Sequence, residues 1–580
     1  MLALFLLNLL FLLPARAREQ ALFTSSVTYC NPPETLLIQQ FDVAYFPNNH
    51  SVAFNISAAS VQANTSVTAH LLLNVYGLQP VNFTIDLCHI LNGALCPLPM
   101  YNFVGADIIQ LPSSANIQNK VPDIAFKIPD LEGFVQLVLT EVGTGTVKAC
   151  VQSTLSNGWS THQPAVTWFT GAVVLLCFFV TIFSSADSFK ATSFLFLELF
   201  RLSQFIVASC LFSLNYPSAF RAFCLNFSWA WFLFPMSPQS PLQNAINHMR
   251  MKTGGDVLDS SGSAIEYVNR KLSPYNAFVA NSAPVLLTKV REVQTVTNSS
   301  SNVLQAGLPI YVNSLGITTP NAFTTVFLCL LMASGIILSL LGLSLLATRY
   351  SDRLRSLIPS SVLRSRWRTR SFFIIPLVFL PVVTLACDQW TLHDSWLASL
   401  FAALCFASLC GVAAYRAFLT QRGQGPTDFR STADTAILGD YKPGHSWFIS
   451  LPIVFSWFTA LLVAFGQGHD VVQLPLFMGL EVLSLAALLV YRPHIRRGDN
   501  IMSICLSLGR LVCIGLMMAF IQRIAVSAIP RTIIGLGISV VFSCGFLWLL
   551  FRFSVHIVHH HRNAGRFHFL KEHETREPSA

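Results

Sequence analysis

The chain has 580 residues, of which 53% are hydrophobic and only 11% are charged. Soluble globular domains carry about 25% charged residues, so this composition excludes a chain that is soluble throughout. The formal net charge of +9 does not indicate nucleic-acid binding. The arginines lie in short segments between apolar runs, which is the pattern that orients membrane proteins. Lipid is therefore the solvent of much of this chain.

The first element is an apolar run over residues 2–13, followed by Ala15-Arg16-Ala17. At 1.5 Å per residue this run is too short to cross a hydrocarbon core of about 30 Å. A short apolar run before a small-residue motif is typical of a cleaved signal peptide. We therefore expect residues 1–17 to be a signal peptide, with an uncleaved anchor as the alternative.

Residues 18–163 contain no window that is long and apolar enough to span a bilayer. Apolar and polar residues alternate over residues 135–140, residues 143–145 read Gly-Thr-Gly, and residues 146–155 are strand-like again. This pattern predicts two strands joined by a hairpin turn. We expect an all-β luminal domain with the architecture of an antiparallel sandwich.

Four of the fourteen cysteines lie in this domain, at Cys30, Cys88, Cys96 and Cys150. An even number of cysteines after a signal peptide indicates disulfides, with three connectivities to choose from. Cys88 and Cys96 flank a short loop that contains Gly93, so a hairpin disulfide is geometrically easy there and leaves Cys30 with Cys150. The other ten cysteines lie in or beside apolar spans, and the absence of any CxxC pair argues against a metal site.

The domain also carries four N-glycosylation sequons within 34 residues, and a fifth follows in a later loop. These sequons are centred on Asn49, Asn55, Asn64, Asn82 and Asn298. They predict a glycosylated surface on the luminal side.

Nine apolar windows follow the β domain, over residues 166–184, 192–214, 322–347, 372–386, 396–417, 447–465, 471–491, 501–521 and 533–553. They predict a mostly α-helical, polytopic bundle of about nine transmembrane helices within residues 164–553. The aromatic segment 216–234 is bounded by Pro217 and Pro235. We interpret it as re-entrant or interfacial, with one extra span as the alternative.

A luminal amino-terminal domain fixes the direction of every later span. The loop over residues 236–320 is then luminal, which agrees with the sequon at Asn298. The loop over residues 348–370 carries seven arginines and one aspartate, which indicates the cytoplasm, as does the basic, histidine-rich tail over residues 554–580. Four of the loop arginines are also candidate contacts to anionic lipid, with simple topogenesis as the alternative. They are Arg364, Arg366, Arg368 and Arg370.

Ionisable residues inside spans cost about 2.5–3.5 kcal/mol each on insertion scales, so each one needs a partner or a cavity. Glu198, Arg201 and Gln204 recur on one face of the second span, where the first two can pair. Glu481 and Arg510 lie in the seventh and eighth spans and can pair only if those helices are neighbours. The five residues are a candidate polar path through the membrane, and structural ion pairs that hold helices together are the alternative.

Catalytic signals are weak in this sequence. Asp388, His393 and Asp394 share a predicted luminal turn, but an intramembrane metal hydrolase needs further ligands from other helices. We find no phosphate-binding loop, nucleophile elbow or kinase signature. We therefore predict neither enzymatic activity nor a bound metal or covalent cofactor.

Several segments, taken in order, resemble the fungal TRP-like ion channel and flavin carrier family. They include Val121-Pro122-Asp123-Ile124, Ile128-Pro129-Asp130-Leu131-Glu132, Leu155-Ser156-Asn157-Gly158, Leu214-Asn215-Tyr216-Pro217, His248-Met249-Arg250 and Tyr491-Arg492-Pro493. The resemblance extends from about residue 23 to residue 553. It implies a luminal ML-like β domain, whose relatives hold lipid or sterol, followed by a TRP-like membrane domain.

The resemblance implies a transport protein that supports FAD entry into the endoplasmic reticulum together with calcium and cell-wall homeostasis. One alternative is a cation channel for Ca²⁺ gated by lipid or tension, and another is a sterol- or lipid-sensing scaffold without transport. FAD is large and anionic and would use Arg201 and Arg510, whereas a cation path would use Glu198 and Glu481. The expected partners are membrane lipids, sterol, an ion or small solute, and further copies of the chain. We expect residence in the endoplasmic reticulum membrane, with the plasma and vacuolar membranes as alternatives.

Overall fold

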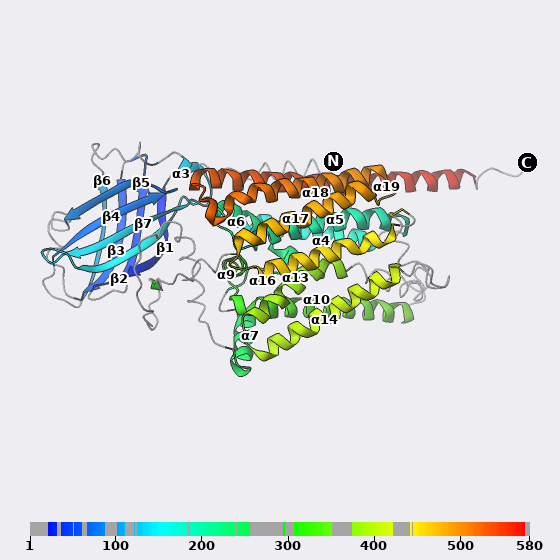
Figure 1. Ribbon diagram of the computed structural model, residues 1–580, viewed down its shortest axis with the longest axis horizontal. Coiled ribbons are helices and arrows are strands. Elements are labelled where there is room, and N and C mark those ends of the chain that lie inside the picture. The colour runs from blue at the N-terminus through cyan, green and yellow to red at the C-terminus, as the bar shows by residue number, and fades with distance from the viewer. Residues whose placement is uncertain are drawn as a thin grey trace, which may run out of the picture.

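The computed structural model describes residues 21–31, 36–49, 51–60, 66–86, 101–110, 121, 124–183, 186–237, 240–255, 294–295, 307–350, 374–421, 441–442 and 445–574. Strands gather at one end of the molecule and long helices fill the rest (Figure 1). Several predicted features lie outside the described residues and stay predictions. They are the signal peptide, Cys88, Cys96, Asn64, Asn298, Arg364, Arg366, Arg368 and Arg370.

The β domain is a sheet whose main ladder is antiparallel, with the strand order β5-β4-β7-β8-β1-β2-β3-β6, and the two-residue β9 (Gln294–Thr295) pairs with β1 in parallel. These strands are β1 (Leu22–Asn31), β2 (Leu36–Phe46), β3 (Ser51–Ser60), β4 (Val67–Val75), β5 (Leu78–Asp86), β6 (Tyr101–Gln110), β7 (Gly133–Glu141) and β8 (Val147–Ser156). The predicted hairpin is confirmed, because β7 and β8 pair through a turn in which Gly143 and Gly145 adopt φ of 94° and 67°.

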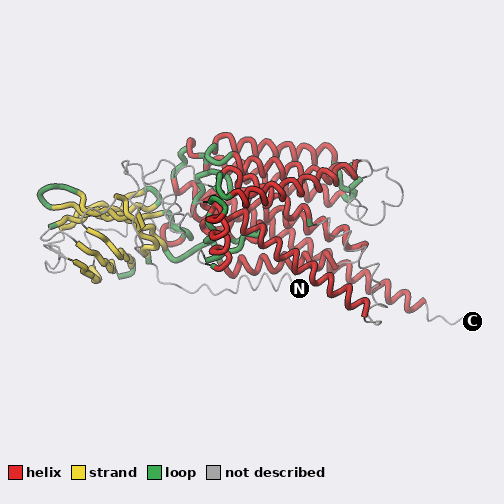
Figure 2. The backbone as a smooth tube through the Cα atoms, turned by 90° about the horizontal axis from the view of Figure 1, so that it is seen from below, coloured by secondary structure: helices red, strands yellow, loops and turns green. Residues whose placement is uncertain are grey.

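One hydrophobic core joins strands that are far apart in this ladder. Phe41 of β2, Ala69 of β4 and Val135 of β7 are all buried in it. A flat sheet would keep β2 and β4 apart, so the sheet must bend around the core. Figure 2 shows its strands in two layers. The expected all-β antiparallel class is confirmed, in the form of a sheet that curves like half a barrel.

The structure describes some of the predicted covalent sites. Cys150 is disulfide-bonded, and the pairing of β1 with β8 sets Asn31 opposite it. Cys30 lies in that same strand, so its backbone is close to Cys150, while the pairing itself stays a prediction. Asn49 and Asn82 are exposed and Asn55 is half-buried.

The membrane domain is a bundle of long helices, as expected. They are α4 (Pro164–Phe183), α5 (Ala186–Cys210), α10 (Ala322–Tyr350), α13 (Ile375–Thr391), α14 (Trp396–Gln421), α16 (Leu451–Phe465), α17 (Asp470–Tyr491), α18 (Arg497–Met517) and α19 (Ala528–Glu574). Within the described residues, eight helices are long and apolar enough to cross a membrane. The fourth predicted window forms the shorter α13, whose 17 residues reach about 25 Å and are mostly buried among other helices.

The aromatic segment after α5 does not span the membrane. It forms α6 (Ser218–Leu225) and the 3₁₀ helix η4 (Ser228–Trp231). Eight helical residues extend only about 12 Å, and both pieces are packed against the bundle, with Phe220 and Trp231 fully buried. The alternative of an extra span is therefore wrong.

The bundle has two distinct ends. The proximal end lies against the β domain and carries α6, α7 (Pro241–Lys252), α9 (Leu308–Ser314) and the turn between α13 and α14 (Figure 1). The distal end carries the turn between α17 and α18. The helix α19 runs from the β domain past the distal end, so the predicted tail begins as a continuation of the last span.

A buried ion pair joins the β domain to the bundle at the proximal end. Glu132 Oε2 accepts from Arg531 Nη2 of α19 at 2.9 Å, and Glu132 Oε1 accepts from the backbone N–H of Ser218 at 2.9 Å. Both charged side chains are 7% exposed. Ala528, in the first turn of α19, belongs to the β-domain core. We call Glu132, Ser218 and Arg531 the joint.

We expect Glu132→Ala to destabilise the protein strongly. The substitution leaves a buried guanidinium and a helix amino-terminal N–H unpaired, and breaking such a pair costs about 3–5 kcal/mol. Thermal unfolding of the solubilised full chain measures the loss. Glu141→Ala is the matched control, because Glu141 pairs with Lys148 at the base of the β7–β8 turn, whose residues 142–147 are exposed. An ion pair this close to the surface contributes little to stability. Equal stability of the two variants would contradict a role for the joint.

Candidate functional site: a charged cavity in the helical bundle

A polar cavity of about 130 Å³ lies among α5, α13, α16, α17 and α18. The five residues of the candidate polar path all line it: Glu198, Arg201 and Gln204 from α5, Glu481 from α17 and Arg510 from α18. We call it the charged cavity. Helix packing therefore brings the three α5 residues together with Glu481 and Arg510, although about 280 residues separate α5 from Glu481 in the chain.

The α5 side of the charged cavity is a polar stripe on one helical face. Arg201 Nη1 lies 3.0 Å from Glu198 Oε1, the i,i+3 pair that the spacing predicts. Gln204 donates from Nε2 to the Leu377 backbone carbonyl of α13 at 2.6 Å, and the Gln204 backbone carbonyl accepts from Trp231 Nε1 at 3.1 Å. Gln204 thus ties α5 to α13 and η4, while the Glu198–Arg201 pair faces the cavity.

The opposite side holds a second ion pair. Arg510 Nε lies 3.2 Å from Glu481 Oε2, and the side chains are equally buried at 15% exposure. The Arg510 guanidinium also stands over the Phe205 ring, 5.6 Å from its centroid. Two carboxylates and two guanidinium groups give the cavity a formal charge of zero. Removing any one of them would leave a net unit charge in a site of low dielectric constant.

Phenylalanine rings close the proximal side of the charged cavity. Phe205 and Phe477 line it, and the Phe477 ring centroid lies 5.6 Å from that of Phe205 and 4.7 Å from that of Phe212. Phe542 packs edge-on against Phe205 at 5.9 Å. All four rings are buried. We call Phe205, Phe212, Phe477 and Phe542 the aromatic floor. A layer of this kind excludes water and ions until its rings separate.

Tyr441 and His494 line the distal side of the charged cavity. They form an antiparallel backbone bridge, and their ring centroids are 5.0 Å apart. Ser503 Oγ lies 3.4 Å from His494 Nε2, and Asn500 bonds the His494 backbone through both amide atoms. His494 Nδ1 is buried without a hydrogen-bond partner in the part of the chain that the structure describes. The sequence analysis missed both residues, although Tyr491-Arg492-Pro493, a segment of the family resemblance, adjoins His494.

Burial lowers the pKa of His494 below its usual value of 6.5. The folded protein therefore holds the neutral imidazole at a pH where the unfolded chain takes up a proton. Stability is unaffected above the unfolded pKa and falls as the pH drops from that value toward the folded pKa. We expect the melting temperature to stay level above about pH 7 and to fall as the pH drops below the usual histidine value of 6.5, and to fall less in His494→Gln. Parallel curves for the two proteins would contradict this assignment.

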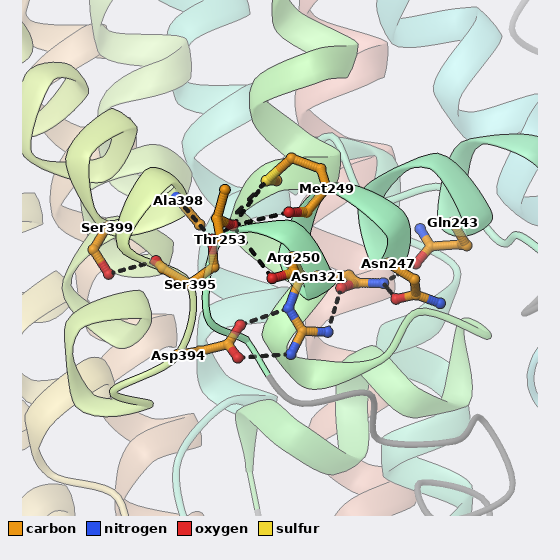
Figure 3. A network of polar contacts seen from close by, with 10 residues as sticks. All are labelled: Gln243, Asn247, Met249, Arg250, Thr253, Asn321, Asp394, Ser395, Ala398 and Ser399. Carbon is orange, nitrogen blue, oxygen red and sulfur yellow. Dashed lines mark hydrogen bonds and ion pairs between the residues drawn. The ribbon is translucent and has the colours of Figure 1, made fainter.

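A separate polar network fixes the proximal end (Figure 3). Arg250 of α7 pairs with both carboxylate oxygens of Asp394, at 2.5 and 2.9 Å, and donates from Nη1 to Asn321 Oδ1 at 2.9 Å. Asn321 donates in turn to Gln243 and Asn247 of α7. The network anchors α7 to the start of α10 and to the turn between α13 and α14. Asp394 is therefore engaged in a structural pair.

The structure assembles no metal centre from the predicted luminal cluster. His393 is bonded at Nδ1 to the Thr391 carbonyl, and Asp394 is held by Arg250. Over the described ranges of the chain, no group of three or more His, Cys, Asp or Glu side chains is arranged to hold a metal ion.

Comparison with known proteins gives two family matches that cover nearly the whole chain. The model for the transient receptor potential (TRP) ion channel matches residues 163–577, and the model for the ML-like domain matches residues 22–161.

Relatives of the chain are fungal membrane proteins. The TRP-like ion channel protein flc1 of Cryptococcus neoformans is 32% identical over 92% of this chain and 76% of its own length. The TRP-like ion channel pkd2 of Schizosaccharomyces pombe is 24% identical over 90% of this chain and 76% of its own. The putative flavin carrier protein 3 of Saccharomyces cerevisiae is 23% identical over 87% of this chain and 64% of its own. No solved structure matches the chain.

Proposed function

Because the chain belongs to the TRP ion channel family and carries an ML-like domain over residues 22–161, we propose that the charged cavity binds cations along a conducting path through the helical bundle. Membrane transport or channel activity follows from the family itself. The observation that carries the proposal is the convergence of Glu198 and Glu481 on one cavity that the aromatic floor closes. Carboxylates within the bilayer are typical of ion paths, and hydrophobic constrictions are typical of gates.

The size of the charged cavity favours an ion over FAD. Pockets that hold small organic ligands usually measure about 300–1,000 Å³, whereas this cavity measures about 130 Å³. It has room for several water molecules or a partly hydrated cation. The name of one relative, a putative flavin carrier, supports FAD as the second candidate solute. Transport of FAD would require the bundle to open much further than conduction of an ion.

Reconstitution of the full chain into liposomes tests the proposal. One batch holds a trapped Ca²⁺ indicator and the other takes up FAD, which is followed by its own fluorescence. We expect Ca²⁺ entry that exceeds leakage into protein-free liposomes, and no FAD uptake. FAD uptake without cation entry would overturn the proposal and favour the carrier function.

We also propose the orientation that the sequence predicts, with the β domain in the lumen and the distal end in the cytoplasm. Exposure of the sequons at Asn49 and Asn82 supports it. Endoglycosidase treatment of the native protein should increase its gel mobility, and Asn49→Gln with Asn82→Gln should reduce that shift. An unchanged mobility would contradict luminal placement. In the same proposal, the protein resides in the endoplasmic reticulum membrane, and its ML-like domain holds a lipid or sterol. Several copies of the chain form a homo-oligomeric channel.

A further inference from the structure

A second cavity, much larger than the charged one, lies on another side of α5. It measures about 1,250 Å³ and is lined by α4, η4, α5, α10, α13 and α14. No charged side chain is among the described residues that line it, and its hydroxyl groups are those of Thr167, Ser334 and Ser408. Each of these hydroxyls donates to a protein acceptor, such as the Leu331 carbonyl for Ser334. We call it the apolar cavity.

The apolar cavity opens toward the bilayer. Trp168 of α4 and Leu331 and Leu338 of α10 line it and are at the same time 64%, 53% and 66% exposed. The helix α4 packs mainly on α5 and η4, while α10 packs mainly on α13, with smaller contacts to α7 and α14. Water gains no hydrogen bonds in a space of this kind, and in a membrane the surrounding medium is lipid. The occupant that the walls favour is therefore an apolar chain.

The length of the apolar cavity matches one leaflet of a membrane. Its lining extends from Thr167 to Phe178 on α4 and from Phe327 to Leu338 on α10. Eleven helical steps cover about 16 Å, and one leaflet contributes about 15 Å of hydrocarbon. The Trp168 and Phe234 rings stack at 6.3 Å at the proximal rim, where aromatic side chains mark the level of the lipid head groups.

We propose that the apolar cavity binds a glycerophospholipid of the proximal leaflet, with its acyl chains among α4, α10 and α14 and its head group outside the Trp168–Phe234 rim. The volume exceeds the range of about 300–1,000 Å³ that is usual for compact ligands, which favours a two-chain lipid over a sterol. The lack of charged wall residues requires the head group to stay outside.

The lipid would lie against the helices that enclose the charged cavity. Phe200 of α5 lines the apolar cavity, while its neighbours Glu198 and Arg201 line the charged one. On α13, Leu377 lines the apolar cavity and Leu380 lines the charged cavity. A lipid that fills the apolar cavity therefore sets the spacing of α5 and α13. Regulation of the charged cavity by the lipid rests on the proposed function, whereas binding of the lipid does not.

Photolabelling tests the lipid site. The full chain is reconstituted in phosphatidylcholine vesicles that contain a trace of phosphatidylcholine with a photoreactive group in one acyl chain, and labelled peptides are mapped by mass spectrometry. We expect labelling concentrated on cavity-lining residues of α4 and α10, and unchanged when sterol is added to the vesicles. Even labelling of all lipid-facing helices, or loss of the cavity labelling on addition of sterol, would overturn the proposal.

Two pairs of variants sharpen the test. Ala333→Trp places an indole in the apolar cavity, whereas Ile336→Trp alters the same helix at a position that is 62% exposed and outside the lining. We expect cavity labelling to fall about tenfold in the first variant and to stay unchanged in the second. Ala172→Trp and Leu176→Trp form the equivalent pair on α4, should Ala333→Trp fail to fold. Undiminished labelling in a folded cavity-filling variant would overturn the site.

Ca²⁺ entry is measured on the same vesicles. Specific labelling without Ca²⁺ entry would support the lipid site and contradict the proposed function. Ca²⁺ entry without specific labelling would support the proposed function and contradict the lipid site.

Discussion

Replacing Glu481 by glutamine is expected to reduce Ca²⁺ entry into liposomes at least about tenfold, whereas replacing Arg510 by glutamine is expected to increase it. The two residues pair at 3.2 Å in a cavity whose formal charge is zero. Glu481→Gln leaves a net charge of +1, which repels a cation. Arg510→Gln leaves −1, which attracts one. At about 4 Å, with an effective dielectric constant near 20, a unit charge contributes about 4 kcal/mol, so tenfold is a conservative estimate.

The double variant separates charge from folding. Each single change leaves a partly buried charge unpaired and therefore also destabilises the bundle. Glu481→Gln with Arg510→Gln restores neutrality without the ion pair, and we expect its Ca²⁺ entry to return close to that of the wild type. Glu141→Gln, on the exposed β7–β8 hairpin, is a control for charge outside the membrane. Loss of Ca²⁺ entry in all three charged-cavity variants would mean that the ion pair is structural. Increased Ca²⁺ entry in Glu481→Gln together with decreased entry in Arg510→Gln would indicate that the cavity favours an anionic solute.

The sequence predicts local features of this protein well, because they depend on neighbouring residues. The alternation over residues 135–140 and the glycines at 143 and 145 predict the β7–β8 hairpin, and apolar windows predict the spans. Pro217 and Pro235 bound a segment that indeed stops short of spanning. In the same way, the i,i+3 spacing of Glu198 and Arg201 leads directly to their ion pair.

Features that depend on helix packing could not be derived in this way. The pairing of Glu481 with Arg510 needed α17 and α18 to be neighbours, and their convergence with α5 needed the whole bundle. The joint connects Glu132 to Arg531, residues 399 positions apart. Asn226 begins a further sequon, yet the folded chain buries it, with its amide donating to the Thr161 carbonyl. Aromatic residues are so frequent in this chain that nothing in the sequence distinguishes the aromatic floor.

Truncation of the aromatic floor is expected to make the protein leak. Phe477 is 1% exposed, lines the charged cavity and contacts the rings of Phe205 and Phe212. Phe477→Ala removes the ring that closes the proximal side, so water and ions can enter where an apolar layer excluded them. We expect unstimulated Ca²⁺ entry to rise at least about tenfold, together with a loss of roughly 3–5 kcal/mol of stability for a buried phenylalanine.

Because Phe477→Ala also destabilises the protein, it requires a control variant that loses a similar free energy of unfolding at a site outside the charged cavity. Phe323 of α10 is 2% exposed and packs on Phe327, away from the charged cavity. Phe323→Ala should lose similar stability and stay tight, whereas a leak in both variants would indicate general loosening of the bundle. Phe477→Leu retains an apolar side chain and should leak less than Phe477→Ala. If Phe477→Ala stays tight, the barrier to ions lies elsewhere. Because the charged cavity supplies the carboxylates and the floor supplies the barrier, a leak in Phe477→Ala that Glu481→Gln suppresses would place both on one path.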